Sequence, residues 1–175
     1  MIPETHSPEP SREEMDAFIE ASRLGNIAVV RGFLTNYPSA IDKKDESGRT
    51  ALMIAVTYKR NNIVTLLLEY DASVNAEDRN KNTPLIMAAT FGNMDAVRML
   101  LEKGADISIK NKSNFTAVRS ADQCGHRDIG DLIEQWPALQ EERRLKQERE
   151  QALATDIADF SPALKRPIRV LRPFK

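Results

Sequence analysis

The sequence contains little cysteine and histidine, and it lacks long apolar runs. Its single cysteine, Cys124, cannot form an intramolecular disulfide, and its two histidines, His6 and His126, are too far apart in sequence to build a zinc site alone. No stretch approaches the roughly 18 apolar residues of a membrane span. The first 15 residues also lack the apolar run of a secretory signal. We therefore expect no metal or other cofactor, and a reducing, cytoplasmic location.

Motifs that carry catalysis are missing as well. The chain has no glycine-rich phosphate loop, no Gly-x-Ser-x-Gly turn and no paired His and Glu on one helix. The 25 Lys and Arg nearly balance the 26 Asp and Glu, so the overall charge does not favour nucleic acid or an anionic membrane. These absences predict a protein that is not an enzyme and that takes no small-molecule substrate.

What the sequence does contain is an internal repeat. Thr50, Thr83 and Thr116 open the similar segments GRTALMIAV, KNTPLIMAA and NFTAVRSAD, and successive threonines are 33 residues apart. The same step relates Asp45 to Asp78 and Leu67-Leu68 to Leu100-Leu101. A fixed period of this length indicates stacked structural units that share one continuous core.

Each unit has the pattern of two short helices. In the third unit, Thr83 can cap a helix start and Pro84 occupies the first helical position, where a missing N–H costs nothing. Gly92-Asn93 ends that helix, and a second helix is predicted from Met94 to Lys103 before the glycine stop at Gly104. Two short helices cannot bury their apolar faces alone, so adjacent units must stack.

The segments TPLIMAATFGNMDAVRMLLEKGADISIK and ESGRTALMIAVTYKRNNIVTLLLEYDASVNAED resemble ankyrin repeats. This resemblance implies an all-α ankyrin-repeat solenoid of stacked helix-turn-helix units with hairpin-like loops. The histidine typical of the family after Thr-Pro-Leu is absent, since Met53, Ile86 and Arg119 stand there. Glu20, Asp122 and Glu134 replace apolar residues of the central units, so the first and fourth repeats are predicted to be polar caps and the protein monomeric.

The composition divides the chain into four parts. We expect a disordered segment, an ankyrin-repeat domain, a charged helix and an extended basic tail that contains prolines. The respective ranges are 1–11, 12–136 (repeats about 12–44, 45–77, 78–110 and 111–136), 137–160 and 161–175.

The two C-terminal parts leave alternatives open. Residues 138–155 mix four acids with four bases, and the helix they predict is either solvated or binds a partner, with Glu142–Lys146 and Lys146–Glu150 as the expected ion pairs. The tail carries five positive charges and no acid. It is either a flexible or clasping segment over the acidic repeats, or a motif that contacts an acidic groove, nucleic acid or lipid.

By resemblance, ankyrin repeats bind proteins through their loop tips and the concave face of each first helix. The family surface then includes Met53, Thr57, Ile86, Thr90 and Gln123. Tyr, Phe and Arg are the side chains that concentrate binding energy. Tyr58 and Phe91, next to turns, can instead simply cover helix ends. The expected partner-binding residues are Arg49, Tyr58, Arg79, Asn82, Phe91, Phe115 and Arg119.

These residues predict a protein-interaction adaptor, scaffold or inhibitor. The alternative is a protein associated with nucleic acid or a membrane, which contacts its target through the basic tail. His126 stands where ankyrin repeats often carry Gly-His, so its role is expected to be structural. Cys124, between two helices, is expected to be partly exposed.

Overall fold

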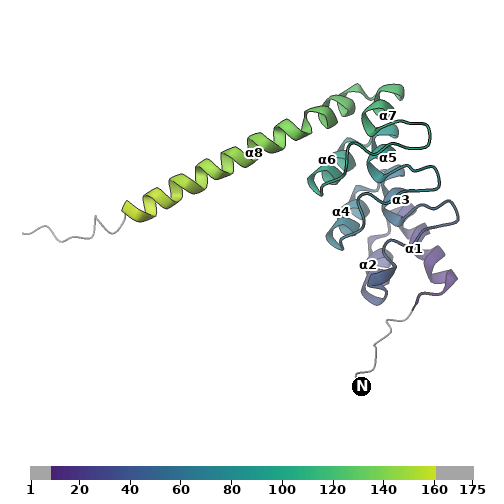
Figure 1. The fold of residues 1–175 in the computed structure, drawn as a ribbon. Helices are drawn as coiled ribbons and strands as arrows, with labels where there is room; N and C mark the ends of the chain where they lie inside the picture. The colour runs from purple at the N-terminus through teal and green to yellow at the C-terminus, as the bar shows by residue number, and fades with distance from the viewer. Residues whose placement is uncertain (1–8, 161–175) are drawn as a thin grey trace, which may run out of the picture. The chain divides into compact units, whose positions relative to one another are not determined.

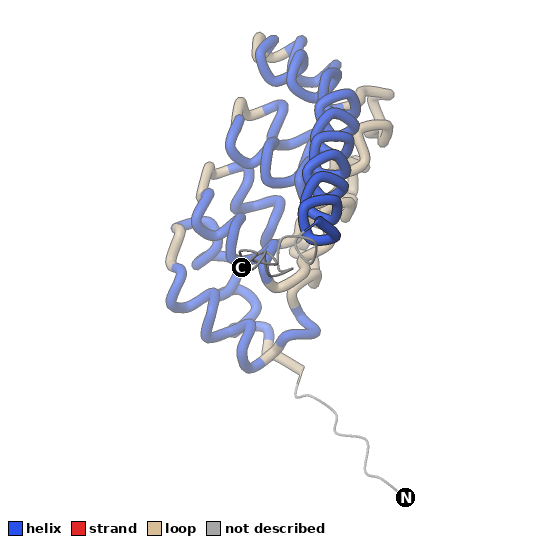
Figure 2. Tube along the Cα trace, turned by 90° about the vertical axis from the view of Figure 1, so that its left-hand side faces the viewer, coloured by secondary structure: helices blue, strands red, loops and turns tan. Residues whose placement is uncertain are grey.

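The structure, a computed structural model, describes residues 9–160, with side chains described as far as residue 154. Within that range the backbone forms helices and loops and contains no strand (Figure 2). A short 3-10 turn, η1 (Pro38–Ala40), follows the second helix. The helices are α1 (Arg12–Leu24), α2 (Ile27–Asn36), α3 (Ala51–Thr57), α4 (Asn61–Glu69), α5 (Pro84–Thr90), α6 (Met94–Glu102), α7 (Ala117–Gln123) and α8 (Arg127–Phe160). The predicted all-α fold is confirmed.

The helices stack in two layers. Helices α1, α3, α5 and α7 pack in chain order into an inner layer, and α2, α4 and α6 pack into an outer layer. The loops that connect successive helix pairs extend together to one side of these layers (Figure 1). Each pair therefore covers an apolar face of the next pair, which is the arrangement that the 33-residue period predicts.

The repeated threonines define where the inner helices begin. The hydroxyl oxygens of Thr50, Thr83 and Thr116 accept hydrogen bonds from the backbone N–H three residues later, at 3.4, 3.3 and 3.4 Å. Each bond satisfies an N–H that has no partner within the helix. The helix-start signals in the sequence are thus confirmed, including Pro84 at the first position of α5.

The core lies between the two layers. Small side chains of the inner layer, Ala55, Ala88 and Ala121, are fully buried and allow close stacking, while Leu67 and Leu100 of the outer layer are buried as well. The two central inner helices, α3 and α5, are enclosed from more than one side, because six consecutive residues of each are buried, Ala51 to Val56 and Pro84 to Ala89. Met53, which we expected on the exposed concave face, is among them, and that expectation is wrong.

Polar side chains join neighbouring repeats. The buried Asn93 side chain donates through Nδ2 to the carbonyl of Val56 at 3.1 Å and to Oδ1 of Asn61 at 2.9 Å. In the outer loops, Oδ1 of Asn75 accepts a bond from the N–H of Asp106 at 2.9 Å. Because each bond connects groups about one repeat apart in sequence, it fixes the spacing between adjacent units as well as satisfying a polar group.

The end repeats carry the expected acids on their surface. Glu20, Asp122 and Glu134 are all exposed. The first repeat, however, also exposes apolar side chains around its helical turn, namely Leu24, Ile27 and Val29. Its surface is therefore less uniformly polar than the sequence pattern suggested.

The chain divides into two compact units, Met1–Glu134 and Gln135–Lys175. Helix α8 runs through this boundary and contains Pro137, whereas the sequence pattern places the end of the repeats at Trp136. In the second unit, Arg144 pairs with Glu141 at 2.6 Å and Glu148 at 3.7 Å. The pairs expected for Lys146 do not form in the described part of the chain, so that expectation is wrong.

Two of the expected segments lie largely or wholly outside the described residues. These are the N-terminal segment 1–11, of which residues 1–8 are not described, and the basic tail 161–175. The proposed contact of the tail with nucleic acid or a membrane falls there too. Among the helices of the described chain, none is long and apolar enough to cross a membrane.

Candidate partner-binding groove

The loops between helix pairs are each closed by one side chain that recurs every 33 residues. Oδ1 of Asp45 accepts bonds from the N–H groups of Ser47 and Arg49, both at 2.8 Å. Asp78 and Asn111 repeat this pattern in the next two loops. A carboxylate or amide oxygen that accepts two backbone N–H groups stabilises a tight turn without a strand partner. The three loops therefore share one conformation.

Hydrogen bonds connect these loops into a row. The N–H of Arg79 donates to the carbonyl of Ser47 at 3.4 Å, and the N–H of Lys112 donates to the carbonyl of Asn80 at 2.9 Å. Nδ2 of Asn111 also donates to Oδ1 of Asn82 at 2.9 Å. Because both backbone and side-chain hydrogen bonds connect one loop to the next, the three loops form one continuous edge, which we call the loop row.

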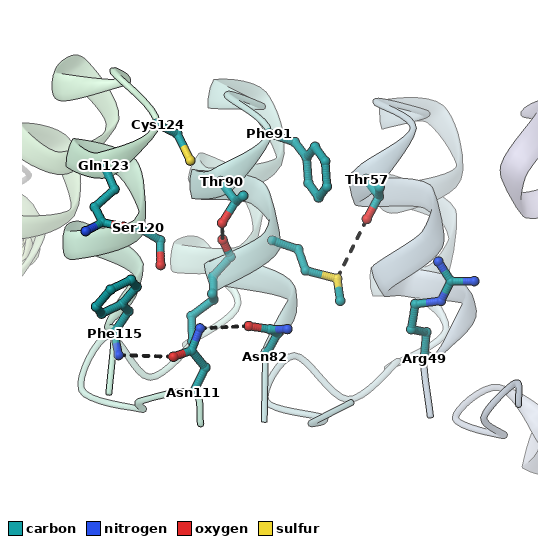
Figure 3. A pocket seen from close by; sticks show the side chains of 12 residues that line it. Arg49, Thr57, Asn82, Thr90, Phe91, Asn111, Phe115, Ser120, Gln123 and Cys124 are labelled. Atoms are coloured by element: carbon teal, nitrogen blue, oxygen red, sulfur yellow. Dashed lines mark hydrogen bonds between the residues drawn. The ribbon is translucent and has the colours of Figure 1, made fainter. Parts of the chain in front are cut away.

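A groove of about 390 Å³ lies between this row and the inner helices. Figure 3 shows side chains from the loops on one side and from the ends of α3, α5 and α7 on the other, all around the same space. The lining residues are Arg49, Thr57, Asn82, Ile86, Met87, Thr90, Phe91, Asn111, Phe115, Ser120, Gln123 and Cys124.

Most hydroxyl groups of the groove are already engaged with the protein. Thr57, Thr90 and Ser120 donate to the carbonyls four residues earlier in their own helices, at 2.8, 2.8 and 2.9 Å. These side chains therefore present methyl or methylene groups more than free donors. With Met87 and Phe91, they make the helical wall of the groove largely apolar.

Four of the seven residues expected to bind a partner line this groove: Arg49, Asn82, Phe91 and Phe115. Phe91 leaves 45% of its surface exposed, which is high for a phenylalanine beside a hydrophobic core. Ile86, expected on the same concave face, lines the groove too, although it is almost fully buried.

The other three expected residues lie elsewhere. The Arg23 guanidinium lies 5.6 Å from the ring centre of Tyr58, so Tyr58 covers the end of α3 and contacts the first repeat. Arg119 lies over the ring of Phe115 at 4.9 Å, and thus borders the groove without lining it. Arg79 is exposed on the loop row.

Sequence reasoning missed several residues of the groove, including Met87, Asn111, Ser120 and Cys124. The period could have identified Asn111, because it stands 33 residues after Asp78 and performs the same turn-closing role. Met87 gave no such signal, since it occupies a row of residues that are buried in the central repeats. Cys124 is exposed, as its position between two helices predicted.

The electrostatics at the first-loop end of the groove depend on Asp45. Burial tends to raise its pKa, but bonds from the backbone and guanidinium of Arg49 and from the N–H of Ser47 outweigh it, so the pKa of Asp45 is lowered. The Arg49 guanidinium lies 2.9 Å from the carboxylate. The ion pair aligns Arg49 at the groove and neutralises much of its charge.

Groups of three or more His, Cys, Asp or Glu residues able to hold a metal ion are absent from the described part of the chain. What the groove offers is an apolar wall, exposed aromatic surface and a few amide and cationic groups on a fixed edge. That combination binds a side chain or a peptide segment by burial and hydrogen bonding.

Comparison with known protein families identifies the repeats. A family model described as ankyrin repeats, in three copies, matches residues 18–111 and, in an overlapping second alignment, residues 74–134. The two alignments cover more than half of the chain and include all three loops and the whole groove. None of the curated proteins compared matches the sequence.

Proposed function

The chain belongs to the ankyrin-repeat family, whose members generally bind proteins and typically are not enzymes, and from this premise we propose that it is a non-catalytic protein-interaction module. Its partner binds in the groove between the loop row and the inner helices. Arg49, Asn82, Phe91 and Phe115 contact the partner inside the groove, and Arg79 and Arg119 contact it at the rim.

The exposure of Phe91 is the observation that carries this proposal. A phenylalanine with 45% of its surface exposed loses favourable burial, and it stands on the wall of a groove whose hydroxyl groups are engaged internally. A partner side chain placed against Phe91 recovers that burial. Because the loops are already hydrogen-bonded to one another, little ordering entropy is lost on binding.

We further propose that the protein works as an adaptor, scaffold or inhibitor, that it is monomeric on its own and that it acts in the cytoplasm. In each of these roles its effect on a partner is to occupy a surface or to hold it near another protein.

The proposal is tested with a pair of matched substitutions. Tyr58 and Phe91 occupy equivalent positions at the ends of α3 and α5, and they are exposed to similar extents, 42% and 45%. Only Phe91 lines the groove. The full chain, Phe91→Ala and Tyr58→Ala are immobilised separately, and proteins retained from a native lysate are compared by quantitative mass spectrometry.

We expect a protein that the unaltered chain and Tyr58→Ala both retain and that Phe91→Ala loses. Its affinity for the Phe91→Ala variant should fall by about tenfold or more, which is typical of an aromatic residue at the centre of an interface. Equal retention by all three proteins, with the variants folded by circular dichroism, contradicts the groove as the binding site.

A further inference from the structure

A set of exposed cations borders the groove at its third- and fourth-repeat end. Arg79 and Lys81 stand on the second loop, Lys112 on the third, and Arg119 in the first turn of α7, and all four are exposed. Within residues 9–160, none of them forms an ion pair. We refer to these four residues as the cation row.

The first loop differs sharply from the cation row. Its two acids are each matched by a cation, Glu46 by Arg12 at 3.0 Å and Asp45 by Arg49 at 2.9 Å. The charge of that loop is thus balanced within the protein. The second loop carries two cations and one acid, Asp78, and the third loop carries one cation and no acid, so the excess positive charge of the groove's border lies around these two loops.

The cation row is tied to the groove by direct contacts. Lys112 donates its backbone N–H to Asn80 of the neighbouring loop, which places the charged tips of the two loops side by side. Arg119 stacks over Phe115, one of the groove-lining rings. A ligand seated against Phe91 and Phe115 therefore lies next to Arg119 and close to the loop tips that carry the other three cations.

From this arrangement we infer that the partner presents an acidic peptide segment that contains a bulky apolar side chain. The apolar side chain occupies the groove between Phe91 and Met87, and the flanking carboxylates lie against the cation row. The inference rests on the proposed function and names the chemistry of its partner. Charge complementarity of this kind speeds association and excludes basic segments.

A nucleic acid fits the same surface less well. Single strands bind protein through positive grooves with open aromatic faces on which bases stack. Here the guanidinium of Arg119 already covers a face of Phe115, so of the two rings that line the groove Phe91 alone offers an open face, too few for successive bases to stack on. The groove volume of about 390 Å³ matches one or two side chains, and its wall is mostly apolar.

The single cysteine of the chain offers a direct readout of groove occupancy. Cys124 is exposed and lines the groove. A ligand in the groove should slow its reaction with the neutral reagent N-ethylmaleimide, measured on the full chain by mass spectrometry. The probes are three pools of 12-residue peptides with a central Phe or Leu flanked by Glu and Asp, by Gln, or by Lys. A fourth pool has acidic flanks and a central Ala.

We expect the acidic pool with a central Phe or Leu to protect Cys124 at the lowest concentration. The Gln pool lacks the flanking carboxylates, and the acidic pool with a central Ala lacks the bulky apolar side chain. Each should therefore need a peptide concentration at least about tenfold higher for the same protection of Cys124. The Lys pool should not protect. A 12-nucleotide thymidine strand is tested alongside, and protection by it at lower concentration than the acidic pool overturns the inference in favour of nucleic acid.

Charge reversal sharpens the test. Arg79→Glu combined with Lys112→Glu takes the cation row from four positive charges to a net charge of zero, so it should abolish the preference of the groove for the acidic pool over the Lys pool. The matched control, Arg98→Glu with Lys103→Glu, makes the same change in net charge at exposed residues of α6 and its end that do not line the groove. It should leave the preference for acidic peptides unchanged, apart from a small loss of affinity that is the same for both acidic pools.

The outcomes separate the two levels of the proposal. If the Gln and Lys pools protect as well as the acidic pool, and reversal of the two loop charges changes nothing, the acidic partner is overturned while the groove keeps its role. If no pool protects Cys124, even at millimolar peptide, both the acidic partner and the groove as a peptide site are overturned.

Discussion

His126 lies against Gly92 of the preceding repeat, so closely that a Cβ atom built on Gly92 would be 2.5 Å from Cε1 of the imidazole. Gly92 also has a φ of +64°, which disfavours any residue with a side chain. The glycine that ends α5 and the histidine before α8 are thus one packing unit. This supports the structural role predicted for His126.

Gly92→Ala should therefore destabilise the protein for two reasons, strain in the backbone and displacement of the imidazole. We expect a loss of about 2–4 kcal/mol in the free energy of unfolding, measured by urea denaturation. Gly104→Ala is the matched control, since Gly104 has a φ of +81° but no atom within 4 Å of its added Cβ. It should cost only about 1–2 kcal/mol.

A double-mutant cycle separates the two contributions. In a His126→Ala background, Gly92→Ala should cost no more than Gly104→Ala does, because the obstructing ring is gone. If the cost of Gly92→Ala is the same in both backgrounds, the contact with His126 does not contribute to the effect.

The core of the outer layer gives a second prediction. Leu100 of α6 is fully buried, so Leu100→Ala should lower the free energy of unfolding by about 2–5 kcal/mol. Leu145, which leaves 45% of its surface exposed, is the control, and Leu145→Ala should change stability by less than about 0.5 kcal/mol. Equal effects at the two leucines would mean that Leu100 does not contribute to the cooperative core.

The sequence was sufficient for the features that local chemistry determines. Thr83 with Pro84 marks a helix start, because a capping hydroxyl and a missing N–H suit that position in any context. The 33-residue step then transfers each such signal to the neighbouring repeats. For this reason the inner helices, their caps and the turns closed by Asp45 and Asp78 follow from one well-marked repeat.

The sequence was less informative where packing from several directions decides the result. Met53 follows Leu52 on a short helix, and only the structure shows that neighbours on both sides bury it. Tyr58 and Phe91 are equivalent by period, yet Arg23 reaches only Tyr58. Helix α8 continues through Pro137, since proline removes one hydrogen bond but does not always end a helix that is otherwise well formed.

The ion pair of Asp45 predicts a pH dependence. Because the folded-state pKa of Asp45 is lowered, its contribution to stability is present above the unfolded value of about 3.9 and is lost as the pH falls through the lower, folded value. Asp45→Asn keeps the acceptor oxygen, as Asn111 does in its own loop, but loses the charge. Asp45→Ala loses both.

At pH 7 we expect Asp45→Ala to cost about 1–3 kcal/mol and Asp45→Asn clearly less, by urea denaturation. The difference in stability between the unaltered chain and Asp45→Asn should shrink toward zero as the pH falls through the lowered pKa of Asp45. A difference that grows on acidification contradicts the assignment, since it implies a raised pKa.

The oligomeric state gives a fourth prediction. The exposed acids of the end repeats predict a monomer, and light scattering at micromolar concentration should give the mass of one chain, 19.7 kDa. The exposed Leu24 and Ile27 of the first repeat are the main features that favour self-association instead. If a tight dimer is observed, the prediction is wrong, and Leu24→Ser with Ile27→Ser tests whether the first repeat forms the contact.

The last prediction concerns deletion of residues 162–175, which removes the five positive charges of the basic tail. The cation row gives the border of the groove the same sign of charge, so like-charge repulsion opposes a clasp of the tail over this groove. We expect the deletion to change the concentration of the acidic peptide pool that protects Cys124 by less than about twofold, since only long-range attraction is lost. Tighter binding after deletion would instead identify the tail as a clasp that competes for the groove. Loss of a partner that the Phe91→Ala variant still retains would identify the tail itself as the binding motif.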